Sequence, residues 1–391
     1  MSSINGIIDR NKRTTDFSLL HEMGRATVLR GGDQSGAYVN GNVGLYCNRR
    51  IGDEDEETRQ PYTVTVNGKN YTAVVDGEIS GAPRSSAETA IEYYLSFGQD
   101  CFSKFDGDFA LAICDEYRGE TLLARSAGSS RPLYCSYNNG RLVFSSEIKG
   151  MLRAFSGAIR LDEKKLKDHL LSPAGSYSSG DIYMDIDELP NGQCVIFSPL
   201  GVRFAPCASS YIKKECREDI IIPDEPDLSD IRGYLAEALV AFDYPQFDMF
   251  MPSVMDVLRY ARSKQKRAAL VVDGALGYSE RYVKERADRL GGFFGVSLVC
   301  SSSDPERIKD KSYKKLDRVL EEVLNTCDIK ILEGIYGEGT VERVRRERSI
   351  ESRIRMTGML CQTSFLAKTQ PILICADGVT RDVYASRLST I

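Results

Sequence analysis

An acidic–glycine–acidic triplet, Asp76-Gly77-Glu78, directly follows two valines. A glycine between acidic residues after small β-formers is typical of a hairpin turn, and such a turn can form one wall of a substrate pocket. Earlier in the chain an arginine pair, Arg49-Arg50, offers guanidinium groups, which bind carboxylates through two parallel hydrogen bonds. Each signal is weak by itself, so its meaning depends on the elements that position it.

The composition is that of a globular protein. The 391 residues are 42% hydrophobic and 27% charged, with a net charge of −5, which is enough chain for two domains. The net negative charge does not favour binding to nucleic acid. No apolar run reaches the length of about 18 residues that a membrane span needs. The first residues also lack a signal-peptide layout. We expect a cytoplasmic protein that binds neither nucleic acid nor membrane.

Cysteine and histidine usage narrows the chemistry further. The eleven cysteines include no CxxC pair, which indicates reduced thiols and not a disulfide framework. His21 and His169 are the two histidines in the chain, so we expect no histidine-rich metal site and assign no metal ligands.

The first half of the chain is rich in short strand patterns with few helices between them, which predicts layered sheets with helices outside. The predicted strands are 4–8, 38–45, 62–66, 71–75, 109–115, 121–125, 133–137, 141–145 and 194–198, and the predicted helices are 17–23, 86–97 and 163–171.

The second half has a different pattern. After a charged segment with two prolines, an all-apolar strand over 268–272 lies between helical patterns at 255–262 and 278–290, which is typical of an α/β domain. We therefore expect a first domain over 1–207, a linker over 208–232 and a second domain over 233–391.

Taken in order, the motifs of the first half resemble the class II glutamine amidotransferase domain of asparagine synthetases. The matching segments are 105–113, 122–125, 131–134, 144–149 and 189–192. The resemblance implies an α/β protein with an α+β first half. Its first domain would be an Ntn-hydrolase-like αββα sandwich, followed by a truncated adenine-nucleotide-α-hydrolase-like α/β domain.

The family's chemistry uses an N-terminal cysteine, whose thiolate attacks the glutamine amide while its own α-amine acts as base. In this chain Ser2 stands at that position, behind Met1. An alcohol is a weaker nucleophile than a thiol at neutral pH. The resemblance therefore leaves two options for Ser2: an inert terminal residue, or a slow nucleophile once Met1 is removed.

Other family positions are changed as well. In the family, an asparagine amide and a glycine N–H form the oxyanion hole. The matching residues in this chain, and therefore the candidate catalytic positions, are Asp76 and Gly77. Asp76 offers a hydrogen-bond acceptor where the family has a donor. The resemblance assigns substrate binding to Arg50, Glu78 and Ser86. Arg50 matches the arginine that binds the glutamine carboxylate in the family. Ser86 replaces the aspartate that binds the glutamine amine.

The synthetase half lacks the expected signature. No phosphate-binding PP-loop lies between residues 211 and 242. Asp273 and Gly274 match two residues of the family's nucleotide site and are weak candidates for nucleotide binding. Leu276-Gly277 replaces the acidic pair that follows these two residues in the family. ATP and Mg²⁺ are therefore expected only if this domain is active. The arginine-rich segment 341–355 is either a solvated helix face or a site for an acidic partner or nucleotide phosphates.

These losses together predict an asparagine-synthetase-like protein with degenerate glutaminase and ATP sites, acting as a non-catalytic or regulatory relative. Two alternatives stay open. One is an ATP-dependent amide-forming ligase, of asparagine synthase or peptide/lactam cyclase type, that does not use glutamine. The other is a slow amidohydrolase with Ser2 as nucleophile. A small-molecule amide or amino acid is a possible ligand, and a homodimer or a protein partner is also possible.

Overall fold

The computed structural model describes a defined part of the chain. The described residues are 2–50, 59–82, 84–127, 129, 131–155, 159–171, 182–207, 220–221, 231–243, 250–263, 268–273, 290, 298–303, 314–369, 372–376 and 379–382. They form two compact units. Unit 1 comprises Met1–Ala154 and Ile186–Glu215, and unit 2 comprises Phe155–Asp185 and Cys216–Ile391.

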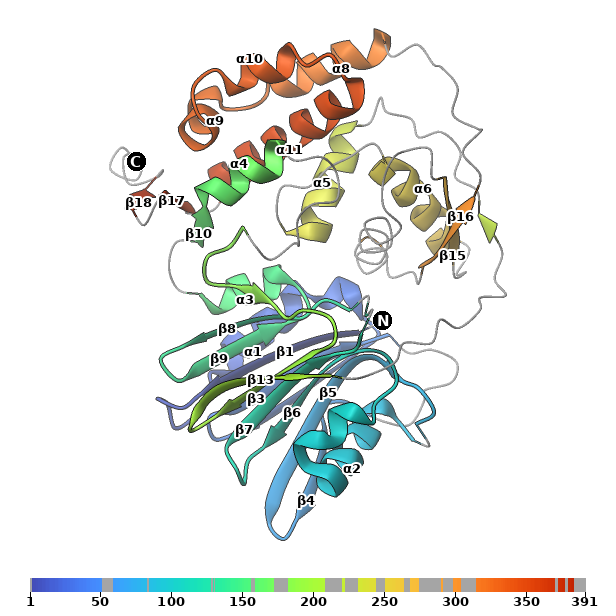
Figure 1. The fold of residues 1–391 in the computed structure, drawn as a ribbon, viewed down its shortest axis with the longest axis vertical. Helices are drawn as coiled ribbons and strands as arrows, with labels where there is room; N and C mark the ends of the chain where they lie inside the picture. Colours follow the sequence, from blue (N-terminus) through green and yellow to red (C-terminus); the bar gives the residue numbers. More distant parts are fainter. Residues whose placement is uncertain are drawn as a thin grey trace. The chain divides into compact units, whose positions relative to one another are not determined.

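Unit 1 is built on two six-stranded antiparallel sheets (Figure 1). The first sheet has the order β11 (Asp187–Glu188), β8 (Tyr134–Asn138), β9 (Arg141–Ser145), β1 (Ser2–Asp9), β3 (Val43–Arg49) and β2 (Gln34–Asn40). The second has the order β13 (Gly201–Pro206), β12 (Gln193–Ser198), β7 (Glu120–Arg125), β6 (Gly107–Asp115), β5 (Lys69–Ile79) and β4 (Tyr62–Val66).

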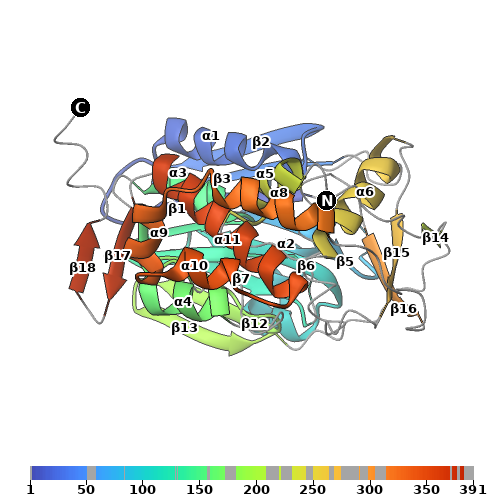
Figure 2. The ribbon, with the colours of Figure 1, turned by 90° about the horizontal axis from the view of Figure 1, so that it is seen from above.

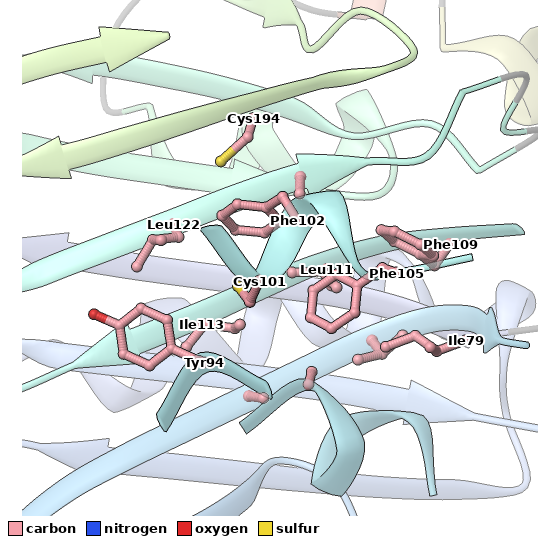
Figure 3. Close-up of a cluster of buried hydrophobic side chains, with 14 of the residues drawn as sticks. Ile79, Tyr94, Cys101, Phe102, Phe105, Phe109, Leu111, Ile113, Leu122 and Cys194 are labelled. Carbon is pink, nitrogen blue, oxygen red and sulfur yellow. The ribbon is translucent and has the colours of Figure 1, made fainter. Parts of the chain in front are cut away.

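The two sheets and three helices form four layers. One apolar cluster joins the facing sides of the sheets, with Ile4 and Leu45 from the first and Val74 and Ala112 from the second. Helices α1 (Phe17–Ala26) and α3 (Ile148–Ala154) pack on the first sheet, and α2 (Ser86–Phe97) packs on the second. A second cluster fills the space under α2, where Tyr94, Phe105 and Leu111 meet (Figure 3). The predicted αββα sandwich is confirmed.

Strand β1 is the centre of the first sheet although it begins at residue 2. It pairs with β3 on one side and β9 on the other, and all eight of its residues are buried. Because chain ends fray unless pairing or packing holds them, this burial fixes the position of Ser2.

The prediction of a hairpin turn at Asp76-Gly77-Glu78 was wrong. Strand β5 runs through these residues to Ile79, paired with β6 throughout. The hairpin turn that joins β4 to β5 lies instead at Asn67-Gly68, where both residues have positive φ. The turn prediction at Asp76 failed because buried partners hold this carboxylate inside the sheet, as described below.

Other element predictions were close. Helix α2 and strand β9 have the predicted bounds, whereas the single predicted strand over 38–45 is divided between β2 and β3. The division falls at Gly41, whose φ is +53° and which therefore turns the chain back on itself.

Unit 2 contains two three-stranded sheets and several helices (Figure 2). Strands β14 (Ile220–Ile221), β15 (Ala268–Asp273) and β16 (Leu298–Ser303) are parallel, as the apolar β15 pattern predicts for an α/β domain. The helices are α4 (Glu163–Leu171), α5 (Ile231–Phe242), α6 (Phe250–Ser263), α8 (Lys314–Leu324), α9 (Ile329–Tyr336), α10 (Thr340–Arg345) and α11 (Ile350–Thr369).

Residues 155–185 belong to unit 2, although they precede the predicted linker. Strand β10 (Ile159–Asp162) pairs with β17 (Ile372–Ala376), which also pairs with β18 (Val379–Asp382), and α4 packs on α9. These contacts tie the segment to the C-terminal part of the chain. The proposed boundaries at 207 and 232 stay a prediction.

Several sequence-based predictions fall on residues outside the described part: most of the linker, the helix at 278–290 apart from Leu290, and Gly274. Within the described part, no helix is both long and apolar enough to cross a bilayer.

Candidate functional site

The structure brings Ser2 and Asp76 into direct contact. The backbone N–H of Ser2 donates a hydrogen bond to Oδ1 of Asp76 at 3.0 Å. The alternation of β5 explains the contact: Val74 faces the other sheet, so Asp76, two residues on, faces it as well and reaches β1. Asp76 is completely buried and Ser2 is 8% exposed, so the contact is closed to water.

Arg30 completes this contact from the end of the 3₁₀ turn Val28–Arg30. Its Nε–H donates to the carbonyl oxygen of Ser2 at 2.9 Å and to Oδ2 of Asp76 at 3.1 Å, and its Nη2 donates to the same Oδ2 at 2.9 Å. The Arg30 and Asp76 side chains are 3% and 0% exposed. A buried carboxylate is stable only when charge and hydrogen bonds compensate its desolvation, and Arg30 supplies both.

A second guanidinium approaches the other oxygen of Asp76. Arg131 Nη1 lies 3.7 Å from Asp76 Oδ1, and its Nε lies 3.4 Å from Asp108 Oδ2. Ser129 donates a hydrogen bond from its hydroxyl to Asp108 Oδ1 at 3.0 Å. Two carboxylates and two guanidiniums thus form a connected series of ion pairs next to Ser2, and their formal charges cancel. We call Arg30, Asp76, Asp108 and Arg131 the charge cluster.

Gly77 has a structural reason to be glycine. Its φ is +106°, and a Cβ at this position would lie 2.0 Å from the backbone oxygen of Asp108. The close approach lets β5 and β6 stay paired at the point where the charge cluster forms. This requirement holds whether or not the Gly77 N–H serves an oxyanion.

Glu78 and Ser86 lie around the end of β5. Glu78 is opposite Asp108 in the β5–β6 register and is exposed. The hydroxyl of Ser86 accepts a hydrogen bond from the N–H of Ile79 at 3.0 Å, which ties the start of α2 to the end of β5. Ser86 therefore has a structural contact, and the substrate roles of Glu78 and Ser86 stay predictions.

Arg50 is placed near Ser2 by strand register. Ser2 pairs with Arg49 across β1 and β3, and Arg50 follows directly after β3. Its side chain is half-buried. The register is compatible with a ligand contact beside Ser2, and that role also stays a prediction.

A buried polar network holds β1 on the side next to α1. Thr27 is its centre: its hydroxyl accepts from Ser3 Oγ at 2.9 Å and from Asn5 Nδ2 at 3.0 Å. Asn48 donates to Ser3 Oγ at 3.0 Å, and Ser145 donates to Asn5 Oδ1 at 2.7 Å. Satisfied networks of this kind fix one arrangement, so the backbone at Ser2 is rigid.

The predicted nucleotide residues belong to the other unit. Asp273 is the last residue of β15, at the carboxyl end of a parallel strand, and Gly274 lies outside the described residues. Their nucleotide role stays a prediction.

Arg30, Asp108 and Arg131 are the members of the charge cluster that sequence reasoning missed. In the sequence, Arg30 precedes a pair of glycines and Arg131 lies in one of the family motifs, so neither stands out as a partner of Asp76. The signal that could have found them is Asp76 itself, because a carboxylate within an apolar strand demands a nearby cation.

Comparison with known proteins supports the resemblance. A family model described as a glutamine amidotransferase domain matches residues 1–208. The chain belongs to the glutamine amidotransferase domain family. Asparagine synthetase 3 (glutamine-hydrolysing) of Bacillus subtilis is 26% identical over 220 residues, which cover 52% of this chain and 36% of that protein.

A second relative, a putative asparagine synthetase of Methanocaldococcus jannaschii, is 26% identical over 181 residues, covering 39% of this chain and 35% of its own length. The chain thus aligns with about a third of the length of each of these two relatives. Among solved structures, the glutamine phosphoribosylpyrophosphate amidotransferase of B. subtilis is similar with a TM-score of 0.38 and 12% identity, covering 76% of this chain and 65% of that one.

Within this amidotransferase domain, the polar groups around Ser2 contact one another. Its most buried members are engaged in the charge cluster, and Ser2 contributes its N–H and carbonyl oxygen to that cluster. The polar groups around Ser2 therefore hold the start of β1 in place.

Proposed function

We propose that this protein is a non-catalytic, asparagine-synthetase-like relative whose amidotransferase domain does not hydrolyse glutamine. The observation that supports this proposal is that both carboxylate oxygens of Asp76 already accept hydrogen bonds. Oδ1 accepts from the Ser2 N–H, and Oδ2 accepts two hydrogen bonds from Arg30. The position that the family resemblance assigns to an oxyanion donor is therefore filled by an acceptor that its own neighbours already saturate.

The energetic consequence is large. Removing one oxyanion-hole donor costs about 3 kcal/mol of transition-state stabilisation, which is roughly a hundredfold in rate. A developing oxyanion next to Asp76 would also lie beside a carboxylate, which accepts hydrogen bonds, in place of an amide, which donates them. The charge cluster as a whole is neutral, so it supplies no net positive field to compensate.

The residue at the nucleophile position also supports the proposal that the domain does not hydrolyse glutamine. Ser2 offers a hydroxyl in place of a thiol, and its nitrogen, which the family mechanism would use as base, already donates to Asp76. A nitrogen that donates to a buried carboxylate is directed toward that carboxylate and not toward the Ser2 hydroxyl, which opposes its use as a base.

Covalent labelling tests the proposal. Protein whose mass shows that Met1 has been removed is incubated with a diazoketone analogue of glutamine and its intact mass is measured. We expect no adduct. The Ser2→Cys variant is the matched control, since a thiol at the same place reports whether the analogue reaches residue 2. An adduct mapped to Ser2 in the unaltered protein would overturn the proposal and favour a slow amidohydrolase.

A further inference from the structure

Three arginines around the end of α10 line a hollow of unit 2. The hollow has a volume of about 700 Å³ and is lined by Gly339, Glu342, Arg343, Arg346, Glu347 and Arg348. Small-molecule sites commonly have volumes of about 300–1,000 Å³. We call Arg343, Arg346 and Arg348 the arginine triad.

The packing of α10 explains why these side chains face outward. Val341 and Val344 are buried and anchor the helix against α9 and α11. Arg343, Arg346 and Arg348 are exposed, whereas Arg345 and Glu347 are half-buried. Arg343 lies within α10, and Arg346 and Arg348 follow the end of this helix, which packs against α9 and α11 (Figure 2).

Other arginines of the same segment serve the fold. Arg345 Nε lies 3.3 Å from Glu321 Oε2, and Arg345 also pairs with Glu342. Arg353 Nη2 lies 3.0 Å from Glu321 Oε1, and Arg355 donates to the carbonyl oxygen of Leu170. Within the described residues, the triad forms no such ion pair. Its three guanidinium groups outnumber the two carboxylates of the lining, one of which, Glu342, is paired with Arg345.

The backbone that carries the triad is held in place. The N–H of Ser349 donates to Glu347 Oε1 at 2.9 Å, and the N–H of Ser352 donates to Ser349 Oγ at 3.3 Å, which caps the start of α11. Both acidic residues of the lining are thereby engaged, because Glu342 pairs with Arg345.

We propose that the arginine triad binds the phosphates of a diphosphate-bearing ligand. Guanidinium groups match phosphate oxygens through bidentate hydrogen bonds, and a diphosphate offers several such oxygens to three of them. Among the described residues that line the hollow, none has an aromatic or apolar side chain on which a base could stack. The site should therefore recognise the diphosphate group itself, whether it comes from inorganic pyrophosphate or from a nucleoside diphosphate. This site does not depend on the fate of glutamine in unit 1.

Calorimetric titration of the full chain at low ionic strength tests the proposal, with inorganic pyrophosphate as the probe. We expect one site, and at least a tenfold loss of affinity when Arg343, Arg346 and Arg348 are all changed to Gln. The matched control changes Arg232, Arg318 and Lys330 to Gln, which removes the same charge from exposed positions outside the hollow. That control should bind pyrophosphate as the unaltered protein does.

Three further readings complete the test. ADP should bind within threefold of pyrophosphate, and citrate at least tenfold more weakly. The triple Lys variant of the triad, which keeps the charge and loses the bidentate geometry, should bind with intermediate affinity, and circular dichroism should show that each variant is folded.

Absence of pyrophosphate binding, equal affinity in the triad Gln variant, or citrate binding as tightly as pyrophosphate would overturn the proposal. ADP binding tenfold more tightly would overturn its assignment to the diphosphate group.

Discussion

Arg30 and Asp76 form an ion pair, with 2.9 Å between Nη2 and Oδ2, in which both side chains are almost completely removed from solvent. The pair joins the end of the first 3₁₀ turn to the second sheet, and the Arg30 Nε–H extends it to the carbonyl oxygen of Ser2. Since Ser2 begins the central strand of the first sheet, one guanidinium holds together three separate segments of unit 1.

Removal of Arg30 should therefore destabilise unit 1. The Arg30→Met variant leaves Asp76 buried without its main cation, and breaking a buried pair in this way costs about 3–5 kcal/mol. Urea unfolding followed by circular dichroism measures the change. The Arg25→Met variant is the control, because Arg25 pairs with Glu22 on the surface and should leave the midpoint nearly unchanged. Equal midpoints for the two variants would contradict the account.

The Asp76→Asn variant separates the two functions of the carboxylate. Both oxygens of Asp76 accept hydrogen bonds, and a primary amide can replace only one of them as acceptor. The other position would then place an N–H₂ group against a donor. We expect a loss of about 2–4 kcal/mol in the free energy of unfolding. A variant as stable as the original protein would show that the contacts of Asp76 are weaker than their geometry indicates.

Two glycines with positive φ should respond differently to alanine. Gly68 has a φ of +74° and open space where a Cβ would lie, whereas a Cβ on Gly77 would meet a backbone oxygen at 2.0 Å. Gly68→Ala should cost about 1–2 kcal/mol, because only the left-handed backbone opposes it. Gly77→Ala should cost at least twice as much, since β5 and β6 must separate. Thermal unfolding of both variants checks the order, and a smaller effect at Gly77 would contradict it.

The buried thiols make stability fall at high pH. Burial raises the pKa of Cys47, Cys101 and Cys114 from 9.0 to about 12. In the unfolded chain these thiols lose their protons near pH 9, while the folded protein keeps them protonated up to about pH 12. The unfolded state then binds fewer protons, so stability is fully present below pH 9 and declines between 9 and 12.

Urea midpoints at pH 8, 9, 10 and 11 measure this decline. Each thiol contributes a slope of up to about 1.4 kcal/mol per pH unit. The Cys47→Ala variant is the control: its slope above pH 9 should be smaller by one thiol's share, whatever its absolute stability. An unchanged slope would mean that Cys47 does not keep its raised pKa.

Much of unit 1 could be predicted from the sequence because its signals are local. Asn67-Gly68 marks a hairpin through backbone conformation alone, and the apolar spacing of α2 marks a helix through periodicity. The order of motifs then identified the layered fold, which no single pattern could have done.

The charge cluster could not be predicted in the same way. Its members come from positions 30, 76, 108 and 131, and their contacts depend on the stacking of two sheets. Local rules therefore assigned Asp76 to a turn, where a carboxylate is normally solvated. The tertiary contact with Arg30 reverses that preference and keeps the residue in a buried strand.

Ammonia release from L-glutamine is the measurement that tests the central claim most directly. The full chain, with Met1 removed, is assayed beside the Ser2→Cys/Asp76→Asn variant, which restores the thiol and the amide of the family pattern, and beside the glutamine-hydrolysing asparagine synthetase of B. subtilis as positive control. The account predicts that the unaltered chain releases ammonia no faster than buffer. Release at a rate typical of enzymes, about 1 s⁻¹ or more, would contradict it.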